Sequence, residues 1–254
     1  MSSVPPGSLA VVGTGIRAGH LTPESRAAVL AADVLFYLSA DENGGGWLER
    51  LNPDARSLHS LYHEGEPRQE AYERMVEAIL APVAEGRKVC AAFYGHPGVF
   101  VTPSHEAVRR ARALGAEARM LPAVSAEDCL FADLGIDPGR SGCQSYEATS
   151  FLADERPVDS RAHLILWQVS VVGEPLAVAE PNRAGLRTLT DRLLREYPAE
   201  HEVVVYEASP YPLAEPLVLR VPLEGLPDVE VTPMATLVVP PASRRAATTL
   251  PFAS

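Results

Sequence analysis

Short apolar runs alternate with amphipathic segments through the first half of the chain. The apolar runs predict buried strands, at residues 8–13, 33–38, 88–93 and 118–121. The longest amphipathic segment follows Pro67 and predicts a helix, because the apolar residues Ala71, Met75 and Ile79 keep i, i+4 spacing. Other helical patterns lie between the strands, one with Thr22 as its N-cap and one over residues 102–115. The alternation predicts an α/β fold with a mostly parallel sheet.

The second half contains more strands per helix than the first. A helical pattern begins near Ser125 and ends at Gly135, and three apolar runs predict strands, at residues 163–169, 202–207 and 235–240. A second helical pattern lies between the first two of these strands, so the sheet is expected to be mixed. We expect two lobes with a ligand in the cleft between them, because ligands commonly bind at such interfaces. The expected organisation is an N-terminal α/β lobe over 1–121, a C-terminal α/β lobe over 122–241 and a short tail over 242–254.

Composition narrows the class of protein. The 254 residues are 46% hydrophobic, as in a globular protein, and carry a net charge of −11, which argues against a nucleic-acid substrate. No apolar run approaches the roughly 20 residues that a membrane helix needs. The sequence M-S-S-V-P-P-G-S at the start has no basic region, so we expect a cytoplasmic protein.

Two of the predicted strands run directly into loops of small residues. One loop reads Y-G-H-P-G-V-F-V from Tyr94, and the other reads L-P-A-V-S-A from Leu121. In an open α/β sheet, ligands bind outside the carboxyl ends of the strands, and small residues let the backbone come close to a ligand. These loops therefore predict a cofactor pocket, with Tyr94 and His96 as its polar side chains.

These loops also carry a family resemblance. Y-G-H-P-G-V-F-V together with S-A-E-D-C-L-F-A-D-L-G-I-D-P resembles the tetrapyrrole-methylase superfamily, and within it the borosin-type peptide backbone N-methyltransferases, over residues 8–241. Those enzymes transfer methyl groups from S-adenosylmethionine to main-chain amides of a ribosomal peptide. The resemblance implies a two-lobed tetrapyrrole-methylase-like fold, a homodimer and an S-adenosylmethionine site in the inter-lobe cleft. It implies cofactor contacts at Tyr94, His96, Val99, Phe100, Ser125, Ala126, Gln168, Ala208, Ala235 and Thr236.

Tyr62, Arg68 and Tyr72 form a second group of candidate residues. Arg68 follows Pro67 at a helix start, and Tyr72 lies at i+4 on the same face. The residues alone also fit an ordinary exposed arginine beside a half-buried tyrosine. The borosin-type pattern R-x-x-x-Y-x-x-M matches R-Q-E-A-Y-E-R-M, so the resemblance implies that all three line the active site. Tyr72 is then the candidate base, and Tyr94 or Tyr62 the candidate hydrogen-bond donor to the substrate carbonyl.

Other motifs fit known sites less well. The spacing in G-T-G-I-R-A-G is not that of a dinucleotide fingerprint, and Asp33 precedes the second strand instead of ending it. The glycines fit either a tight turn or, by the resemblance, a loop that borders the substrate cleft. The histidines show no metal-ligand spacing, so no metal is expected.

The chain departs from the usual superfamily motifs, which leaves other functions open. Tetrapyrrole methylases commonly show G-x-G-P-G and G-D-P, where this chain has G-T-G-I-R-A-G and G-H-P. Residues 237–254 are too few to loop back as a fused substrate, so we interpret the chain as a split enzyme with a separate precursor peptide as partner. The alternatives are a small-molecule methyltransferase of the tetrapyrrole or precorrin type, and a non-catalytic module that binds S-adenosylmethionine or a peptide.

Overall fold

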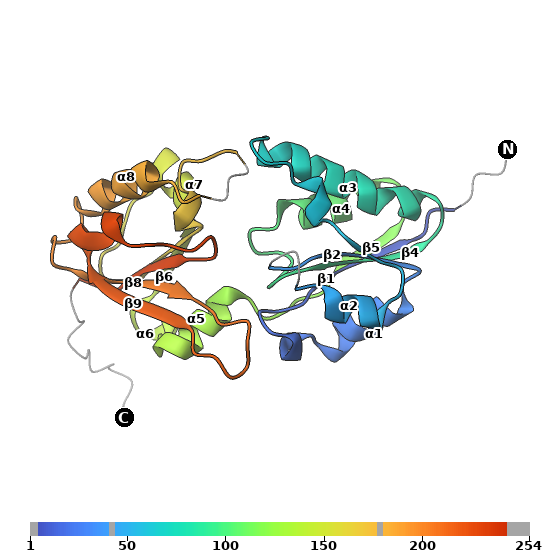
Figure 1. The fold of residues 1–254 in the computed structure, drawn as a ribbon, viewed down its shortest axis with the longest axis horizontal. Coiled ribbons are helices and arrows are strands. Elements are labelled where there is room, and N and C mark those ends of the chain that lie inside the picture. Colours follow the sequence, from blue (N-terminus) through green and yellow to red (C-terminus); the bar gives the residue numbers. More distant parts are fainter. Residues whose placement is uncertain (1–4, 41–43, 177–179, 243–254) are drawn as a thin grey trace, which may run out of the picture. The chain divides into compact units, whose positions relative to one another are not determined.

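The chain folds into two compact units, each built around one β-sheet. A computed structural model describes residues 5–40, 44–176 and 180–242 (Figure 1). The described residues of the first unit belong to Met1–Cys129, Pro175–Ala177 and Ser209–Ala214. Those of the second unit belong to Leu130–Glu174, Val178–Ala208 and Glu215–Ser254. The predicted α/β class is confirmed.

The sheet of the first unit is parallel throughout its described strand pairs. Its order is β3-β2-β4-β1-β5. The strands are β1 (Ser8–Gly13), β2 (Val34–Leu38), β3 (Ala55–Ser57), β4 (Lys88–Phe93) and β5 (Glu117–Met120). The prediction of a mostly parallel sheet is therefore confirmed, although the apolar pattern missed β3. β1 and β4 pair from Ser8 opposite Lys88 to Gly13 opposite Phe93, so the two strands end side by side.

Helices cover both faces of this sheet. α1 (Pro23–Ala31) and α2 (Gly46–Leu51) lie on one face, and α3 (Arg68–Ala84) and α4 (Thr102–Ala113) lie on the other (Figure 1). The short 3-10 helices η1 (Ala18–His20) and η2 (His59–Leu61) lie in the connections. The predicted cap of α1 is present, since Thr22 Oγ1 accepts a hydrogen bond of 3.1 Å from the Ser25 amide.

Residues 43–46 read N-G-G-G, a composition that is typical of a flexible turn, but the last of these glycines belongs to a helix. Gly46 begins α2, whose Leu48 is 1% exposed and packs in the core on that face. Asn43 lies outside the described residues.

The predicted apolar face of α3 is confirmed by the burial of Ala71, Met75 and Ile79. Buried contacts thus fix α3, and its first two turns carry two of the candidate residues, Arg68 and Tyr72.

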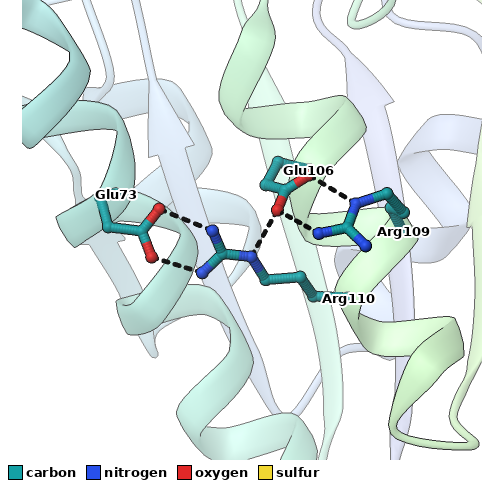
Figure 2. Close-up of polar contacts among 4 residues, drawn as sticks. All are labelled: Glu73, Glu106, Arg109 and Arg110. Carbon is teal, nitrogen blue, oxygen red and sulfur yellow. Dashed lines mark hydrogen bonds and ion pairs between the residues drawn. The ribbon is translucent and has the colours of Figure 1, made fainter.

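A network of charged side chains joins α3 to α4 (Figure 2). Arg110 on α4 holds both carboxylate oxygens of Glu73 on α3, and its Nε donates to Glu106 Oε1 at 2.5 Å. Arg109 donates from Nε to Glu106 Oε2 at 2.7 Å. Hydrogen bonds from Arg109 and then Arg110 lower the pKa of the Glu106 carboxyl from 4.5 to about 2. The carboxylate form is therefore favoured in the folded protein.

This network predicts a stability difference that depends on pH. A carboxyl whose pKa is lowered by folding adds stability above its ordinary pKa, and the contribution is lost as the pH falls from 4.5 toward about 2. We expect Arg110→Gln to unfold at lower urea concentration than the wild type at neutral pH, and the difference to shrink through this window. Arg119→Gln is the control, because Arg119 is exposed and lies 3.8 Å from exposed Glu24. A constant difference across the pH range would contradict the prediction.

The second unit contains a mixed sheet, as predicted. Its order is β6-β7-β10-β8-β9, in which only β6 and β7 pair in parallel among the described strands. The strands are β6 (Cys143–Glu147), β7 (His163–Trp167), β8 (Glu202–Glu207), β9 (Leu217–Pro222) and β10 (Thr236–Val239). The sequence pattern missed β6 and β9.

Helices and short connections complete the second unit. The helices are α5 (Ala126–Leu134), which runs in from the first unit, α6 (Pro138–Ser141), α7 (Ala148–Ala153), α8 (Arg183–Leu193), η3 (Val169–Val171) and η4 (Leu223–Asp228). α5 and α8 were predicted, and Gly135 ends α5 at a φ of +66°, a conformation that favours glycine. Within the described residues, no helix has the length and apolar character needed to cross a membrane.

Candidate active site

The strand order of the first unit contains a topological switch point. From β1 the chain continues to β2, on the far side of β4, whereas from β4 it continues to β5, on the far side of β1. The two connections therefore leave neighbouring strands in opposite directions. In open α/β sheets, such a point forms a crevice at the carboxyl ends of the strands, where ligands bind. The loops after Gly13 and after Phe93 border this position.

Glycines let these loops touch each other. The amides and carbonyls of Gly15 and Gly95 form two reciprocal hydrogen bonds of 3.1 Å, and both residues have φ near +70°. A Cβ on Gly13 would lie 2.3 Å from the Gly95 oxygen and 2.5 Å from the Ala123 Cβ. Gly13 therefore allows close approach of the loops that follow β1, β4 and β5. Glycines in the G-T-G motif serve loop packing, which the motif's spacing alone did not reveal.

Replacing Gly13 by alanine is expected to destabilise the first unit. The added Cβ would overlap a backbone oxygen, and overpacking of this kind typically costs about 1–3 kcal/mol. Gly19→Ala is the matched control, because no atom lies within 4 Å of its Cβ position. Urea unfolding of both variants measures the effect, and equal stability of Gly13→Ala and Gly19→Ala would refute it.

The loop that contains His96 is held by its own side chains. His96 Nδ1 accepts a 3.0 Å hydrogen bond from the Gly98 amide, so this nitrogen carries no proton in the structure. The Val99 amide donates to the His96 carbonyl at 3.1 Å. Val99 is 37% exposed and Phe100 is 45% exposed. Phe100 has a φ of +55°, which is unusual for a large side chain, and strained residues of this kind cluster at functional sites.

Ser125 and Ala126 lie at the start of α5. The Ser125 hydroxyl and amide both donate to Asp128 Oδ2 at 2.7 Å, and the Asp128 amide donates to Ser125 Oγ at 3.2 Å. This reciprocal arrangement caps the helix. The Ser125 side chain is therefore engaged in capping, and Ala126 has no polar side chain. The capping role of Asp128 was not anticipated, although the S-A-E-D spacing carries the signal.

The structure brings Tyr62 and Tyr72 together. Their rings are edge to face, with centroids 6.4 Å apart. Tyr62 lies just after η2, while Arg68 and Tyr72 occupy the first turns of α3. The Arg68 amide donates to the Pro175 carbonyl at 3.3 Å. Tyr94 directly follows β4, at the switch point, and its amide donates to the Leu38 carbonyl at 2.9 Å.

The environment of Tyr62 favours its neutral form. Burial raises the pKa of the Tyr62 phenol well above 10, and Tyr72 raises it further through charge and hydrogen bonding, while the Arg68 cation acts in the opposite direction. A phenol whose pKa is raised keeps its proton at neutral pH. Tyr62 can therefore donate a hydrogen bond, and it is poorly suited to act as a base.

The candidate residues of the second unit lie at the same end of three central strands of its sheet. Gln168 follows β7 and Ala208 follows β8, while Ala235 and Thr236 lie at the start of the antiparallel β10. Gln168 has a left-handed backbone with φ +58°. Ala208, Ala235 and Thr236 are at most 7% exposed. This set and the set of the first unit thus come from separate sheets.

A dinucleotide site does not fit the first unit. α1 begins at Pro23 and not directly after the glycines, and Asp33 accepts a 2.8 Å hydrogen bond from the Lys88 amide at the opposite ends of the strands. The described residues contain no group of three or more His, Cys, Asp or Glu side chains that could hold a metal ion.

Several fungal proteins are similar to this chain. It is 42% identical to the methyltransferase/ribosomally synthesized cyclic peptide gymnopeptides precursor of Gymnopus fusipes, over 92% of this chain and 57% of that protein. It is 41% identical to the corresponding omphalotin A precursor of Omphalotus olearius, over 94% of this chain and 59% of that protein. The chain therefore spans less than two thirds of the length of these relatives.

Solved structures share the fold. Uroporphyrin-III-C-methyltransferase from Thermus thermophilus superposes with a TM-score of 0.63 at 21% identity, over 93% of both chains. Cobalt precorrin-4 methyltransferase superposes with a TM-score of 0.68 at 15% identity, over 92% of this chain and 94% of that chain. The family model of the Tetrapyrrole (Corrin/Porphyrin) Methylases matches residues 8–226. The chain belongs to the tetrapyrrole methylase family.

Proposed function

We propose that this chain is an S-adenosylmethionine-dependent methyltransferase that N-methylates backbone amides of a ribosomally made peptide. The proposal rests mainly on one observation, the contact of Tyr62 with Tyr72 near the start of the helix that also carries Arg68. The names of the similar fungal proteins, which join a methyltransferase to a cyclic peptide precursor, support the same substrate class.

The loops at the switch point are suited to hold S-adenosylmethionine. Glycine backbones with positive φ and the exposed side chains of Val99 and Phe100 offer polar and apolar contacts next to each other. We propose that His96, Val99, Phe100, Ser125 and Ala126 contribute from the first unit, with Tyr94 beside them. The family resemblance adds Gln168, Ala208, Ala235 and Thr236 as further candidate contacts. When bound, the cofactor supplies an electrophilic methyl group.

Tyr72 and Tyr62 have different proposed roles. An amide nitrogen is a poor nucleophile because resonance delocalises its lone pair into the carbonyl, so it must lose its proton as negative charge builds up on the oxygen. Tyr62 keeps its proton and is the proposed donor to that oxygen. Tyr72 is the proposed base, and Arg68 supplies a fixed positive charge one turn before it on α3. Tyr94 is the alternative donor.

The proposed partner is a separate precursor peptide, bound by a homodimer of this chain. A probe for it is the part of the Gymnopus fusipes relative that lies outside its match to this chain, supplied as a separate molecule; we refer to it as the precursor segment. Incubation of the protein with S-adenosylmethionine and the precursor segment should yield S-adenosylhomocysteine only when both are present. A product formed equally without the peptide would contradict the proposed substrate class.

Cofactor binding is expected to be independent of the peptide. Calorimetric titration of the folded protein with S-adenosylmethionine, or with S-adenosylhomocysteine, should give a saturable heat, and treatment with a chelator should leave it unchanged. NADH serves as the control ligand, because the glycine loop does not open a helix as a dinucleotide site requires. The absence of heat at millimolar S-adenosylmethionine would overturn the proposed cofactor.

A further inference from the structure

Tyr62 and Tyr72 lie in segments of different structure, one in an irregular connection and the other in a long helix. Tyr72 belongs to α3, a helix of 17 residues whose apolar face is buried. Tyr62 instead begins the irregular connection between η2 and α3, in which Gly65 has a φ of +80° and no atom within 4 Å of its Cβ position. The connection has few hydrogen bonds of its own. Tyr62 donates its amide to the His59 carbonyl at 3.0 Å, and Glu66 donates its amide to the His63 carbonyl at 3.2 Å.

One arginine of α3 contacts both ends of this connection. Arg74 donates to the Leu61 carbonyl from Nε at 3.2 Å and from Nη2 at 3.0 Å. Its Nη2 also lies 2.7 Å from Glu66 Oε2, which His63 Nδ1 approaches at 3.1 Å. Nη1 lies 3.9 Å from Glu70 Oε2. The Leu61 carbonyl belongs to the peptide unit that continues into Tyr62, so the guanidinium holds the backbone immediately before this tyrosine.

We propose that Arg74 is a positioning residue that fixes Tyr62 relative to Tyr72. The inference rests on the proposed function, because it assigns a role in the same reaction. Two donors to one carbonyl and a third contact to a carboxylate define the orientation of the guanidinium, as a planar fork allows. Hydrogen bonds to a charged group are stronger than neutral ones. Arg74 thereby couples the position of Tyr62, the proposed donor, to the helix that carries Tyr72, the proposed base.

The position of Tyr62 affects the rate and not the binding of the cofactor. A displacement of about 1 Å in a reacting group can lower a rate by roughly a hundredfold. We expect Arg74→Gln to lower kcat with the precursor segment by roughly tenfold or more, with unchanged affinity for S-adenosylmethionine. Glu66→Gln should give a smaller loss, because the contacts of Arg74 with Leu61 remain. Arg74→Lys should recover part of the rate, since an ammonium can satisfy one of the two partners.

A double-mutant cycle separates positioning from a general loss of structure. In a Tyr62→Phe background the hydroxyl that Arg74 positions is absent, so Arg74→Gln should cause little further loss of kcat. The control is Arg109→Gln, which removes an exposed arginine bonded to Glu106 on the same helix, α4, and leaves this loop untouched. Arg109→Gln should turn over like the wild type. Additive losses in the cycle, or wild-type kcat in Arg74→Gln, would overturn the inference.

Hydrogen exchange tests the same contact without any reaction. In Arg74→Gln the amides of Tyr62 and Glu66 should exchange several-fold faster, while those of the buried turns of α3 stay protected. If the wild-type protein methylates nothing, the proposed function fails, and the exchange data alone decide whether Arg74 holds the loop. Unchanged exchange at both amides would refute this role. Should Arg74→Gln fail to fold, Arg74→Lys provides the comparison, because an ammonium can satisfy only one of the two partners and should also speed exchange at one of these amides.

Discussion

Methyl transfer is expected to fall by at least about a hundredfold in Tyr72→Phe and in Arg68→Ala, the range for loss of a general base or an oxyanion donor. Tyr72→Phe removes the oxygen that accepts the amide proton and keeps the ring that packs against Tyr62. Arg68→Ala removes the fixed positive charge one turn before Tyr72 on the same helix. Both variants should bind S-adenosylmethionine with wild-type affinity, because these side chains are proposed to act on the amide. Single-turnover rates and calorimetry measure the two properties separately.

A tyrosine remote from these residues in sequence provides the control. Tyr146 lies on β6 and stacks on Phe151 with ring centroids 6.0 Å apart, so Tyr146→Phe removes a hydroxyl while the ring packing is retained. It should methylate at the wild-type rate. A normal rate in Tyr72→Phe would mean that the Tyr72 hydroxyl has no role in methyl transfer. A loss of cofactor affinity in Arg68→Ala would mean that Arg68 contacts the cofactor.

The long elements of the fold were predictable because the residues that they bury form a regular apolar pattern along the sequence. β1 and β4 are apolar after their first residue, and α3 repeats its apolar residues at helical spacing. β3 and β6 were missed because few of their residues are apolar or buried. β9 reads L-V-L-R-V-P and is apolar, but it is largely exposed and was not recognised as a strand. These strands form at edges of their sheets, where pairing with a neighbour decides the conformation.

The candidate site was predictable in composition more than in geometry. The small-residue loops after β4 and β5 could be recognised from strands that run into glycine and alanine. The need for glycine at position 13 could not, because the atoms that exclude a Cβ there belong to Gly95 and Ala123. The contact of Arg74 with the Leu61 carbonyl is equally absent from any motif. Such contacts depend on how distant loops meet, which spacing along the chain does not encode.

Methylation is expected on main-chain nitrogens of the precursor segment, as a series of mass increments of one methylene each. The proposed chemistry acts on an amide N–H, so the substrate must be presented in an extended form, one amide at a time. Strand-like binding offers main-chain hydrogen bonds with little demand on side chains. Tandem mass spectrometry should therefore place each increment on backbone fragments and not on side-chain losses.

Proline gives this prediction its sharpest test. Proline has no amide hydrogen, so a proline placed at a methylated position of the precursor segment should abolish modification there completely. Alanine at the same position keeps the amide hydrogen and should remain methylated, which makes it the matched control. Tyr62→Phe should reduce every increment together, because the proposed donor serves each amide in turn. Increments on side chains, or an increment that persists at the proline, would exclude the backbone reaction and leave a methyltransferase with a different acceptor.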